Sequence, residues 1–297
     1  MQKKIDLSEI KVCVKGGGDL ASGVAWRLYQ CGFRVFMTEI DQPMAVRRKV
    51  AFCDAIYHGS TVVEGVEALL VHKTDEVFSL WVQGKIPILV DPKGKTCNVI
   101  RPDVLVDAIL AKKNIGTSMH DAPLVIALGP GFEAGQDAHF VVETNRGHNL
   151  GRLLASGSAE ANTGVPGPVQ GITADRVLRS PAEGVWQNDM EIGDLVKKGD
   201  MVGSVAELPV KARIDGVIRG LIHPGITVSK GLKIGDIDPR GNKDNCFTIS
   251  EKALAIAGGV LEGILRVYDN KIQRPCLDKL ITEETHEPGK RTLRYIV

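Results

Sequence analysis

A glycine-rich turn near the start of the chain is the segment whose residue types point most directly to chemistry. The run Val14–Gly23 (VKGGGDLASG) follows a short apolar stretch and precedes residues with helical periodicity. A strand, a glycine turn and a helix N-terminus together direct backbone N–H groups and the positive helix end at an anion. We therefore predict a nucleotide-binding site here, with Gly16, Gly17 and Gly18 at its centre.

Glu39 strengthens the prediction of a nucleotide, because it ends the next predicted strand 21 residues after Gly18. Dinucleotide-binding folds place the carboxylate that bonds a ribose diol near this position. The motif departs from G-x-G-x-x-G, since its third glycine, Gly23, comes two positions late. Asp19 puts a negative charge where a phosphate would lie, so three roles stay open for it: helix cap, metal ligand or partner of a ribose hydroxyl.

Charged residues after two other strands could also contact this ligand. Arg47 and Arg48, with Lys49 beside them, predict either a phosphate contact or a solvated helix face. Asp91 closes an apolar run and is followed by Pro92, which suits either a ligand crevice at a sheet edge or a turn. Both alternatives stay open for each group.

The segment His139–His148 (HFVVETNRGH) is the candidate for substrate contact. Strand alternation puts His139 and Glu143 on one face, with Arg146 and His148 in the loop beyond. Carboxylate and imidazole groups support acid–base catalysis, which makes Glu143 and His148 the candidate catalytic residues, and a guanidinium matches a phosphate or carboxylate. The histidine and glutamate spacing fits no standard metal site, so we predict none.

Alternating strands and helices are expected to position these residues. Apolar runs predict strands, and i, i+4 periodicity from Leu20 predicts a helix after the glycine turn. A second helix is predicted from Pro43 through roughly Tyr57. Strands are predicted at Lys11–Lys15, Arg34–Thr38, Glu67–Val71, Ile86–Val90, Val104–Val106 and Leu124–Leu128. Helices are predicted at Thr74–Gln83, between two of these strands, and at Ser250–Val267, near the C-terminus. This order predicts an α/β fold with an N-terminal Rossmann-like, doubly wound parallel sheet.

An internal repeat marks a different kind of structure in the second half. Residues 180–205 recur as residues 212–237 at an offset of 32, with glycines in register. Two hairpin units packed face to face predict a small all-β, pseudo-twofold domain, since one unit cannot bury its own apolar face. The sequence pattern of the repeat resembles the hammerhead biotinyl/lipoyl domains, which carry their cofactor on a lysine at the tip of the hairpin between the two halves. Here the segment between the halves, Val205–Ala212, lacks a lysine at its tip, and Lys211 falls in the following strand.

The net charge, the length of the apolar runs and the cysteine spacing limit the classes of function that the chain can have. The 297 residues carry a net charge of +1, which does not indicate a basic surface for nucleic-acid binding. No apolar run approaches the roughly 20 residues of a membrane helix. Six cysteines lie far apart in sequence, which argues against disulfide frameworks and for a reducing, cytoplasmic location. We expect a nucleotide-binding region at residues 1–165, the duplicated β-domain at 172–240, and a C-terminal helix and tail at 245–297 packed on the rest.

Long runs of the chain resemble the YqeB-like proteins, which are associated with selenium-dependent molybdenum hydroxylases and are related in part to XdhC-type proteins. The runs are VKGGGDLASGVAWRL, MTEIDQPMAVRRKVAF, DAPLVIALGPGFEAGQDAHFVVETNRGHNLGR, GSAEANTGVPG and ISEKALAIAGGVLEGIL. The resemblance implies a maturation role for a hydroxylase client, and implies functional roles for Gly16–Gly18, Asp19, Glu39, Arg47, Arg48, Glu143, Arg146 and His148. Ile109 departs from the pattern, which has an arginine there.

Three functions follow from these observations. The first is an accessory protein whose ligand is the molybdopterin dinucleotide, since that cofactor carries the pyrophosphate and ribose that a glycine turn accepts. The second is an NAD(P)-dependent oxidoreductase, against which stands the absence of a Y-x-x-x-K proton relay. The third is a non-catalytic client-docking protein. Whether the chain forms a homo-oligomer, and whether it is an enzyme at all, stays open.

Overall fold

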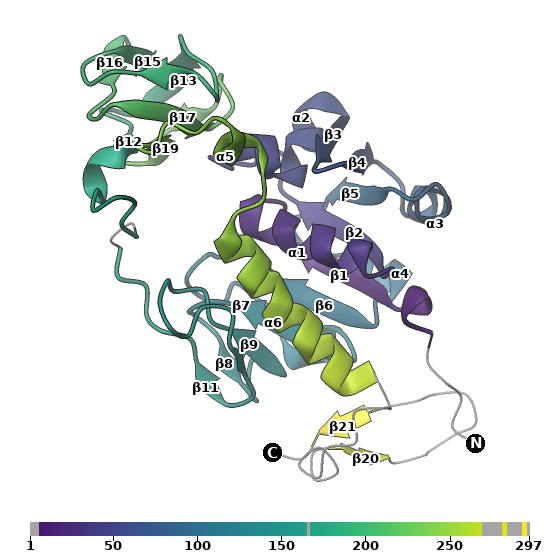
Figure 1. Ribbon diagram of the computed structural model, residues 1–297. Coiled ribbons are helices and arrows are strands. Elements are labelled where there is room, and N and C mark those ends of the chain that lie inside the picture. Colours follow the sequence, from purple (N-terminus) through teal and green to yellow (C-terminus); the bar gives the residue numbers. More distant parts are fainter. Residues whose placement is uncertain (1–5, 165–166, 269–280, 284–292, 296–297) are drawn as a thin grey trace.

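A nine-stranded sheet forms the centre of the computed structural model, which describes residues 6–164, 167–268, 281–283 and 293–295 (Figure 1). Seven neighbouring strands are parallel, and an antiparallel strand closes each edge. In spatial order the strands are β10 (Leu153–Leu154), β9 (Phe140–Val142), β7 (Leu124–Leu128), β6 (Val104–Asp107), β1 (Lys11–Lys15), β2 (Arg34–Glu39), β5 (Ile86–Val90), β4 (Val66–Val71) and β3 (Ser60–Val63).

Two long helices from opposite ends of the chain cover one face of this sheet. Helix α1 (Asp19–Gln30) and helix α6 (Glu251–Tyr268) share one apolar core with alternate residues of β1, including Val12 and Val14. They pack closely because a Cβ added to Gly23 would lie only 2.7 Å from the Cβ of Ala253. The start of α6 therefore lies beside the start of α1 (Figure 1).

The other face of the sheet carries shorter helices. Helix α3 (Thr74–Val82) and helix α4 (Thr96–Ile100) cover a second core that contains Cys13 and Phe36. Two short strands, β8 (Glu133–Ala134) and β11 (Gly157–Ser158), pair beyond β9, and β20 (Ile281–Glu283) pairs with β21 (Leu293–Tyr295). In the described part of the chain, no helix is both long and apolar enough to cross a bilayer.

A β-region lies between the sheet and α6 in the sequence, and its pairing follows the internal repeat. Gly184 pairs with Val228, and the equivalent pair in the other copy is Val196 with Gly216. Each copy thus completes the other around a core that contains Trp186 and Ile218. The two four-stranded sheets consist of β12 (Val177–Arg179), β19 (Lys233–Asp238), β17 (Gly216–Leu221) and β14 (Leu195–Val196), and of β16 (Leu208–Lys211), β15 (Met201–Val205), β13 (Gly184–Asn188) and β18 (Thr227–Val228).

The predicted fold class, a Rossmann-like doubly wound sheet followed by a hammerhead-like domain and a C-terminal helix, is wrong. A Rossmann sheet places its third strand beside its second, whereas here β5 lies between β2 and β4. The connection from β6 to β7 holds only a short 3₁₀ turn (Met119–Asp121) in place of a crossover helix. Helix α6 packs into the core of the main sheet, and the chain is a mixed α/β protein with one large, mostly parallel sheet.

Most predicted elements are confirmed, but the helix from Pro43 through Tyr57 is wrong. That segment forms 3₁₀ turns (Arg48–Val50 and Phe52–Asp54) and a four-residue helix, α2 (Ala55–His58). The N–H of Phe52 donates to Ser22 Oγ at 2.7 Å, and the N–H of Cys53 donates to the carbonyl of Gly17 at 3.0 Å. These bonds hold the segment against the glycine turn and compete with helical hydrogen bonds.

Candidate functional site

The glycine turn is shaped by close packing at two of its three glycines. Gly16 has a φ of +96°, and a Cβ there would meet the Ala108 carbonyl oxygen at 2.9 Å. A Cβ on Gly17 would lie 2.8 Å from the Cβ of Cys53. Gly18, the residue before α1, differs from both, since no described atom lies within 4 Å of an added Cβ. Open space therefore meets the N-terminus of α1 at Gly18.

Glu39 folds back onto the turn. Its Oε2 accepts the N–H of Gly17 at 2.7 Å, and its Oε1 accepts the N–H of Ile40 at 2.8 Å. Burial raises the pKa of this carboxyl, against the opposing effect of those two hydrogen bonds. Both oxygens are thus engaged with backbone donors, which is the arrangement of a brace that fixes the turn.

Arg47 and Arg48 connect the sheet to later parts of the chain. Both are buried, at 9% and 7% exposure, which excludes the solvated helix face. Arg47 Nη2 donates to the carbonyls of Asn245 and Thr248 at 2.9 and 3.0 Å. Arg48 donates to the carbonyl of Leu221 and to Glu191, both in or beside the β-region. These two arginines therefore tie the glycine-turn segment to the β-region and to the chain before α6.

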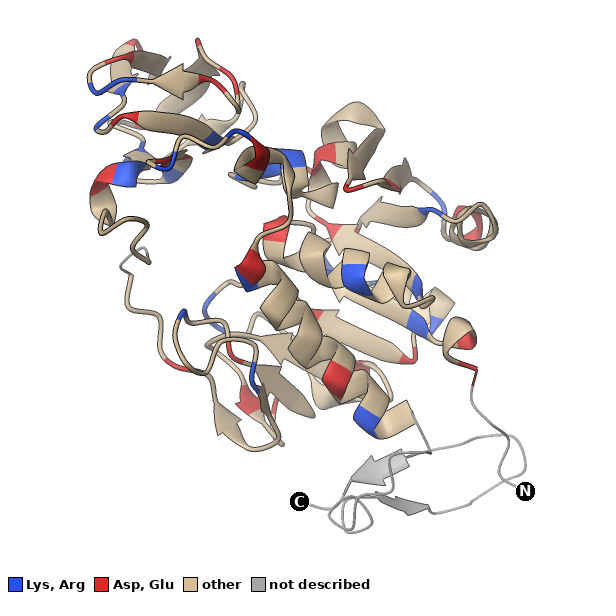
Figure 2. Cartoon of the chain, in the orientation of Figure 1, with Lys and Arg blue, Asp and Glu red and all other residues tan. Residues whose placement is uncertain are grey.

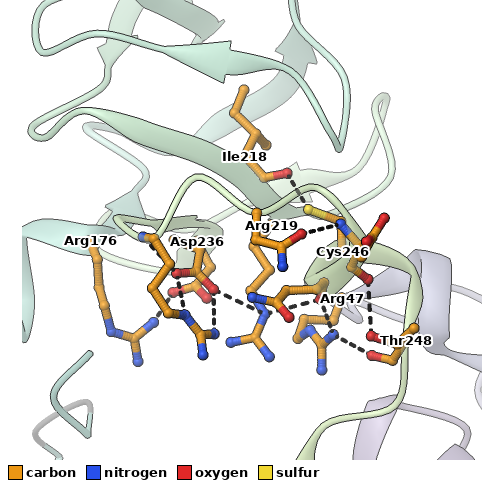
Figure 3. A network of polar contacts seen from close by, with 12 residues as sticks. Arg47, Arg176, Ile218, Arg219, Asp236, Cys246 and Thr248 are labelled. Atoms are coloured by element: carbon orange, nitrogen blue, oxygen red, sulfur yellow. Dashed lines mark hydrogen bonds and ion pairs between the residues drawn. The ribbon is translucent and has the colours of Figure 1, made fainter. Parts of the chain in front are cut away.

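A cluster of arginines and aspartates forms where the β-region meets the start of α1, and we call it the junction cluster (Figure 3). The Nη1 of Arg176 hydrogen-bonds to Asp236, and Arg240 places Nε and Nη2 on the two oxygens of Asp238 at 2.9 and 2.6 Å. Its members are Arg47, Arg176, Arg219, Arg240, Asp236 and Asp238. Four guanidinium groups thus face two carboxylates within the cluster, and Asp19, beside Arg47, is a third carboxylate at its edge.

Two of these arginines have donors to spare. Within the described residues, Arg47 Nε is buried without a hydrogen-bond partner. Arg219 uses only its Nε, which lies 3.4 Å from the Asn245 carbonyl oxygen and 3.8 Å from Asp238 Oδ2. Burial lowers the pKa of Arg47, and the nearby charge of Arg219 lowers it further while Asp19 opposes this. A buried donor without a partner is costly, so an anion that bonded these groups would gain affinity.

Both long helices point their N-termini at this cluster. Figure 2 shows acidic segments where α1 and α6 begin, next to each other, and the first turns of these helices hold Asp19 and Glu251. Asp19 Oδ2 lies 3.7 Å from Arg47 Nη1. Burial and the charge of Arg146 lower the pKa of Lys252, whereas Asp19 raises it. Asp19 is therefore flanked by cations from two elements, and the helix dipoles add to the positive potential.

The segment His139–His148 reaches this site only in part. Arg146 Nη1 bonds Glu251 Oε1 at 2.6 Å in the first turn of α6, whereas His148 is exposed. Glu143 is buried, and its oxygens accept the N–H groups of Asn145 and Glu160 at 2.6 and 2.7 Å. His139 Nδ1 accepts the N–H of Val125, and burial lowers its pKa to about 4. The carboxylate of Glu143 thus organises a loop.

Sequence reasoning missed the arginines of the β-region and Lys252. The signal was present, because Arg219 interrupts an apolar strand (GVIRGL) that is buried along β17. Asp236 and Asp238 likewise sit inside the buried strand β19. Asp91, by contrast, serves the turn, since its Oδ2 accepts the N–H of Thr96 at 2.6 Å. Within the described ranges, no group of three or more histidine, cysteine or acidic side chains could hold a metal ion.

Comparisons with known proteins identify one close relative. Over 262 residues the chain is 49% identical to the uncharacterized protein YqeB of Escherichia coli strain K12. The chain is similar to YqeB along most of its length. The match covers 88% of this chain and 48% of YqeB, so the chain spans about half the length of that relative. No family model matches the chain.

Solved structures show only a weak likeness. A succinylglutamate desuccinylase/aspartoacylase from Rhodobacter sphaeroides aligns with 77% of this chain and 84% of its own, at 13% identity and a TM-score of 0.25. A structure named TcdA (CsdL) aligns with 89% of this chain and 90% of its own, at 9% identity and a TM-score of 0.31. Scores this low lend no support to a shared activity.

Proposed function

We propose that this chain binds a nucleotide-bearing ligand through its phosphates at the junction cluster, and that it acts as an accessory protein for a selenium-dependent molybdenum hydroxylase. The observation that supports the binding is the meeting of spare arginine donors with two helix N-termini beside the open space at Gly18. The accessory role and the hydroxylase client rest on the resemblance to YqeB-like proteins. The molybdopterin dinucleotide would then be cargo.

The donor set suits a phosphate or pyrophosphate group. Guanidinium groups present paired N–H donors that match phosphate oxygens, and hydrogen bonds between charged groups are stronger than neutral ones. Arg219 offers Nη1 and Nη2 from the β-region, and the first N–H groups of α1 lie across the junction next to Asp19. A phosphate at this position would bridge the β-region and the sheet, and Asp19 would turn toward Lys252 or bond a ribose hydroxyl.

The alternative function, an NAD(P)-dependent oxidoreductase, needs a residue that binds the ribose of the cofactor. Glu39 is the residue that would bond the diol of NAD(P), yet each of its oxygens already accepts one backbone N–H group, so a ribose hydroxyl would have to share these acceptors. The glycine turn alone does not select a nicotinamide cofactor, because an anion of any nucleotide fits a helix N-terminus. We therefore favour recognition through phosphates over recognition through the ribose.

Calorimetric titration with CDP, ADP, NAD and molybdopterin dinucleotide tests the binding. Arg219→Gln removes the spare charged donors, so affinity for the ligand that binds should fall about tenfold or more. Arg213→Gln is the matched control, because Arg213 is exposed in the same stretch and lies 4.0 Å from Asp175. Absence of binding by all four compounds, or equal affinity of the two variants, would contradict the proposal.

The accessory role has a separate test. A selenium-dependent molybdenum hydroxylase made in cells that lack this chain should contain little bound cofactor, measured as molybdenum per protein. Restoring the wild-type chain should restore the metal content, and restoring Arg219→Gln should do so only weakly. A fully loaded hydroxylase in the absence of the chain would refute the role while leaving nucleotide binding intact.

A further inference from the structure

The fold brings two cysteines together that lie 84 positions apart in the sequence. Cys13 is in the central strand β1, and Cys97 is in the first turn of α4, which packs on that strand. Their sulfur atoms are 3.4 Å apart. A disulfide bond is about 2.05 Å long, so a small shift of the α4 side chain would bring the two sulfurs to bonding distance. This pair was not predicted from the sequence, because its cysteines are widely spaced there.

The two thiols have different surroundings. Cys13 is fully buried, and burial is the main cause that raises its pKa. Cys97 is only partly buried. The hydrogen bond with Cys13 and, after it, the charge of Lys15 lower the pKa of Cys97, against the effect of burial. Cys97 is thus the more reactive thiol of the pair, and Cys13 is the second thiol, with which it would form a disulfide.

We propose that Cys97 and Cys13 form a reversible redox pair whose oxidant is a hydroperoxide. The Cys97 thiolate attacks the terminal peroxide oxygen, the O–O bond breaks, and Cys97 becomes a sulfenic acid while hydroxide leaves and takes up a proton as water. The Cys13 thiol then attacks the Cys97 sulfur, the S–S bond forms, and a second water leaves. Two thiols and one hydrogen peroxide thus give one disulfide and two waters, and a dithiol reductant reverses the change.

The remaining described cysteines do not share this geometry. Cys53 and Cys246 are buried and Cys31 is exposed, and none of the three lies in sulfur contact with another described cysteine. Cys97 Sγ is the atom at which the oxidation starts, because Cys97 is the one described cysteine that combines partial exposure of the residue with a thiol neighbour. A metal role does not fit the pair, since no third ligand joins it among the described residues.

Peptide mapping of the oxidised wild-type chain tests the proposal without relying on a variant. After one equivalent of hydrogen peroxide and capping of free thiols, the peptides that contain Cys13 and Cys97 should appear linked, and dithiothreitol should release them. The melting temperature should rise on oxidation, because the bond closes a long loop of the unfolded chain. Linkage of other cysteines, or oxidation confined to Cys31, would overturn the proposal.

Variants separate the two steps. Cys97→Ser should abolish the peroxide-dependent linkage, whereas Cys31→Ser, the matched surface control, should leave it unchanged. With a second equivalent of hydrogen peroxide, the Cys97 sulfenic acid of Cys13→Ala should be oxidised to sulfinic acid, which dithiothreitol does not reverse. Circular dichroism of each variant checks that the buried substitution folds. A Cys13→Ala protein that folds and whose Cys97 still recovers fully with dithiothreitol would contradict the role of Cys13 as partner.

Discussion

The glycine turn and the junction cluster lie beside each other but are built in opposite ways. At the turn, Glu39 already satisfies the N–H of Gly17, so the local donors are largely engaged within the chain. At the junction cluster, Arg47 and Arg219 keep donors that no described residue accepts. The turn is thus a braced structural feature, and the cluster is the place where an anion would find partners.

This difference shows that a recognisable motif and the place where a ligand binds need not coincide. The turn is local, since its residues follow one another and Glu39 ends the neighbouring strand β2. The cluster is assembled from Arg47 after β2, the β-region and the segment before α6, which lie up to about 200 positions apart. Three substitutions test the contrast, and they are ordered by the expected loss of unfolding free energy.

Arg47→Met should have the largest effect. Methionine keeps the length and apolar stem, but the carbonyls of Asn245 and Thr248 lose a charged donor. We expect a loss of about 3 kcal/mol in the free energy of unfolding, measured by urea denaturation, at the low end for two charged hydrogen bonds. Lys49→Met, at the exposed neighbouring position, should change it by less than about 0.5 kcal/mol. Similar losses for both would mean that Arg47 does not hold the junction.

Gly23→Ala should have the next largest effect, because it separates the two helices whose N-termini meet at the cluster. The new methyl group would lie 2.7 Å from the Cβ of Ala253, so α1 and α6 must move apart, at a cost of about 1–3 kcal/mol. Gly258→Ala is the control on α6, where an added Cβ meets nothing within 4 Å. Helix propensity alone should stabilise that variant by about 0.5–1 kcal/mol. Thermal unfolding should therefore shift in opposite directions for the two variants.

The sequence was sufficient to predict the local elements of this region. Glycine residues and short apolar runs encode a turn and its strands within a few positions, so β1, β5 and β7 match the predicted bounds. Strand order is not encoded locally, and the hairpin of β3 and β4 with the inserted β5 could not be derived from alternation. The failed helix at Pro43 has the same origin, because Ser22 and Gly17 bond Phe52 and Cys53 across the fold.

The binding groups were predictable only in part for a related reason. Arg47 stood out as a charge after a strand, but its partners at Asn245 and Thr248 lie near the other end of the chain. Arg219 acquires its neighbours only when the β-region docks, although a charged residue inside a buried strand is a signal in itself. Cys13 and Cys97 likewise become neighbours only through the packing of α4 on β1.

Glu39→Gln should have the smallest effect, and its pH dependence tests the brace directly. Glutamine keeps one acceptor, so the N–H of either Gly17 or Ile40 loses its partner, at a cost of about 1 kcal/mol near neutral pH. Burial raises the pKa of Glu39 above its ordinary 4.5, so the folded state holds this proton more tightly than the unfolded chain does. The contribution of the protonated carboxyl is therefore full below the ordinary pKa and is lost as the pH rises through the raised value. The stability of wild type relative to Glu39→Gln should fall with rising pH across that window, measured by urea denaturation from about pH 4 to about pH 8.

The nucleotide affinity of Glu39→Gln should stay within about twofold of wild type. A tenfold loss of affinity for the ribonucleotide, with a smaller loss for its 2′-deoxy counterpart, would instead show that Glu39 binds the ribose and that the turn is part of the binding site.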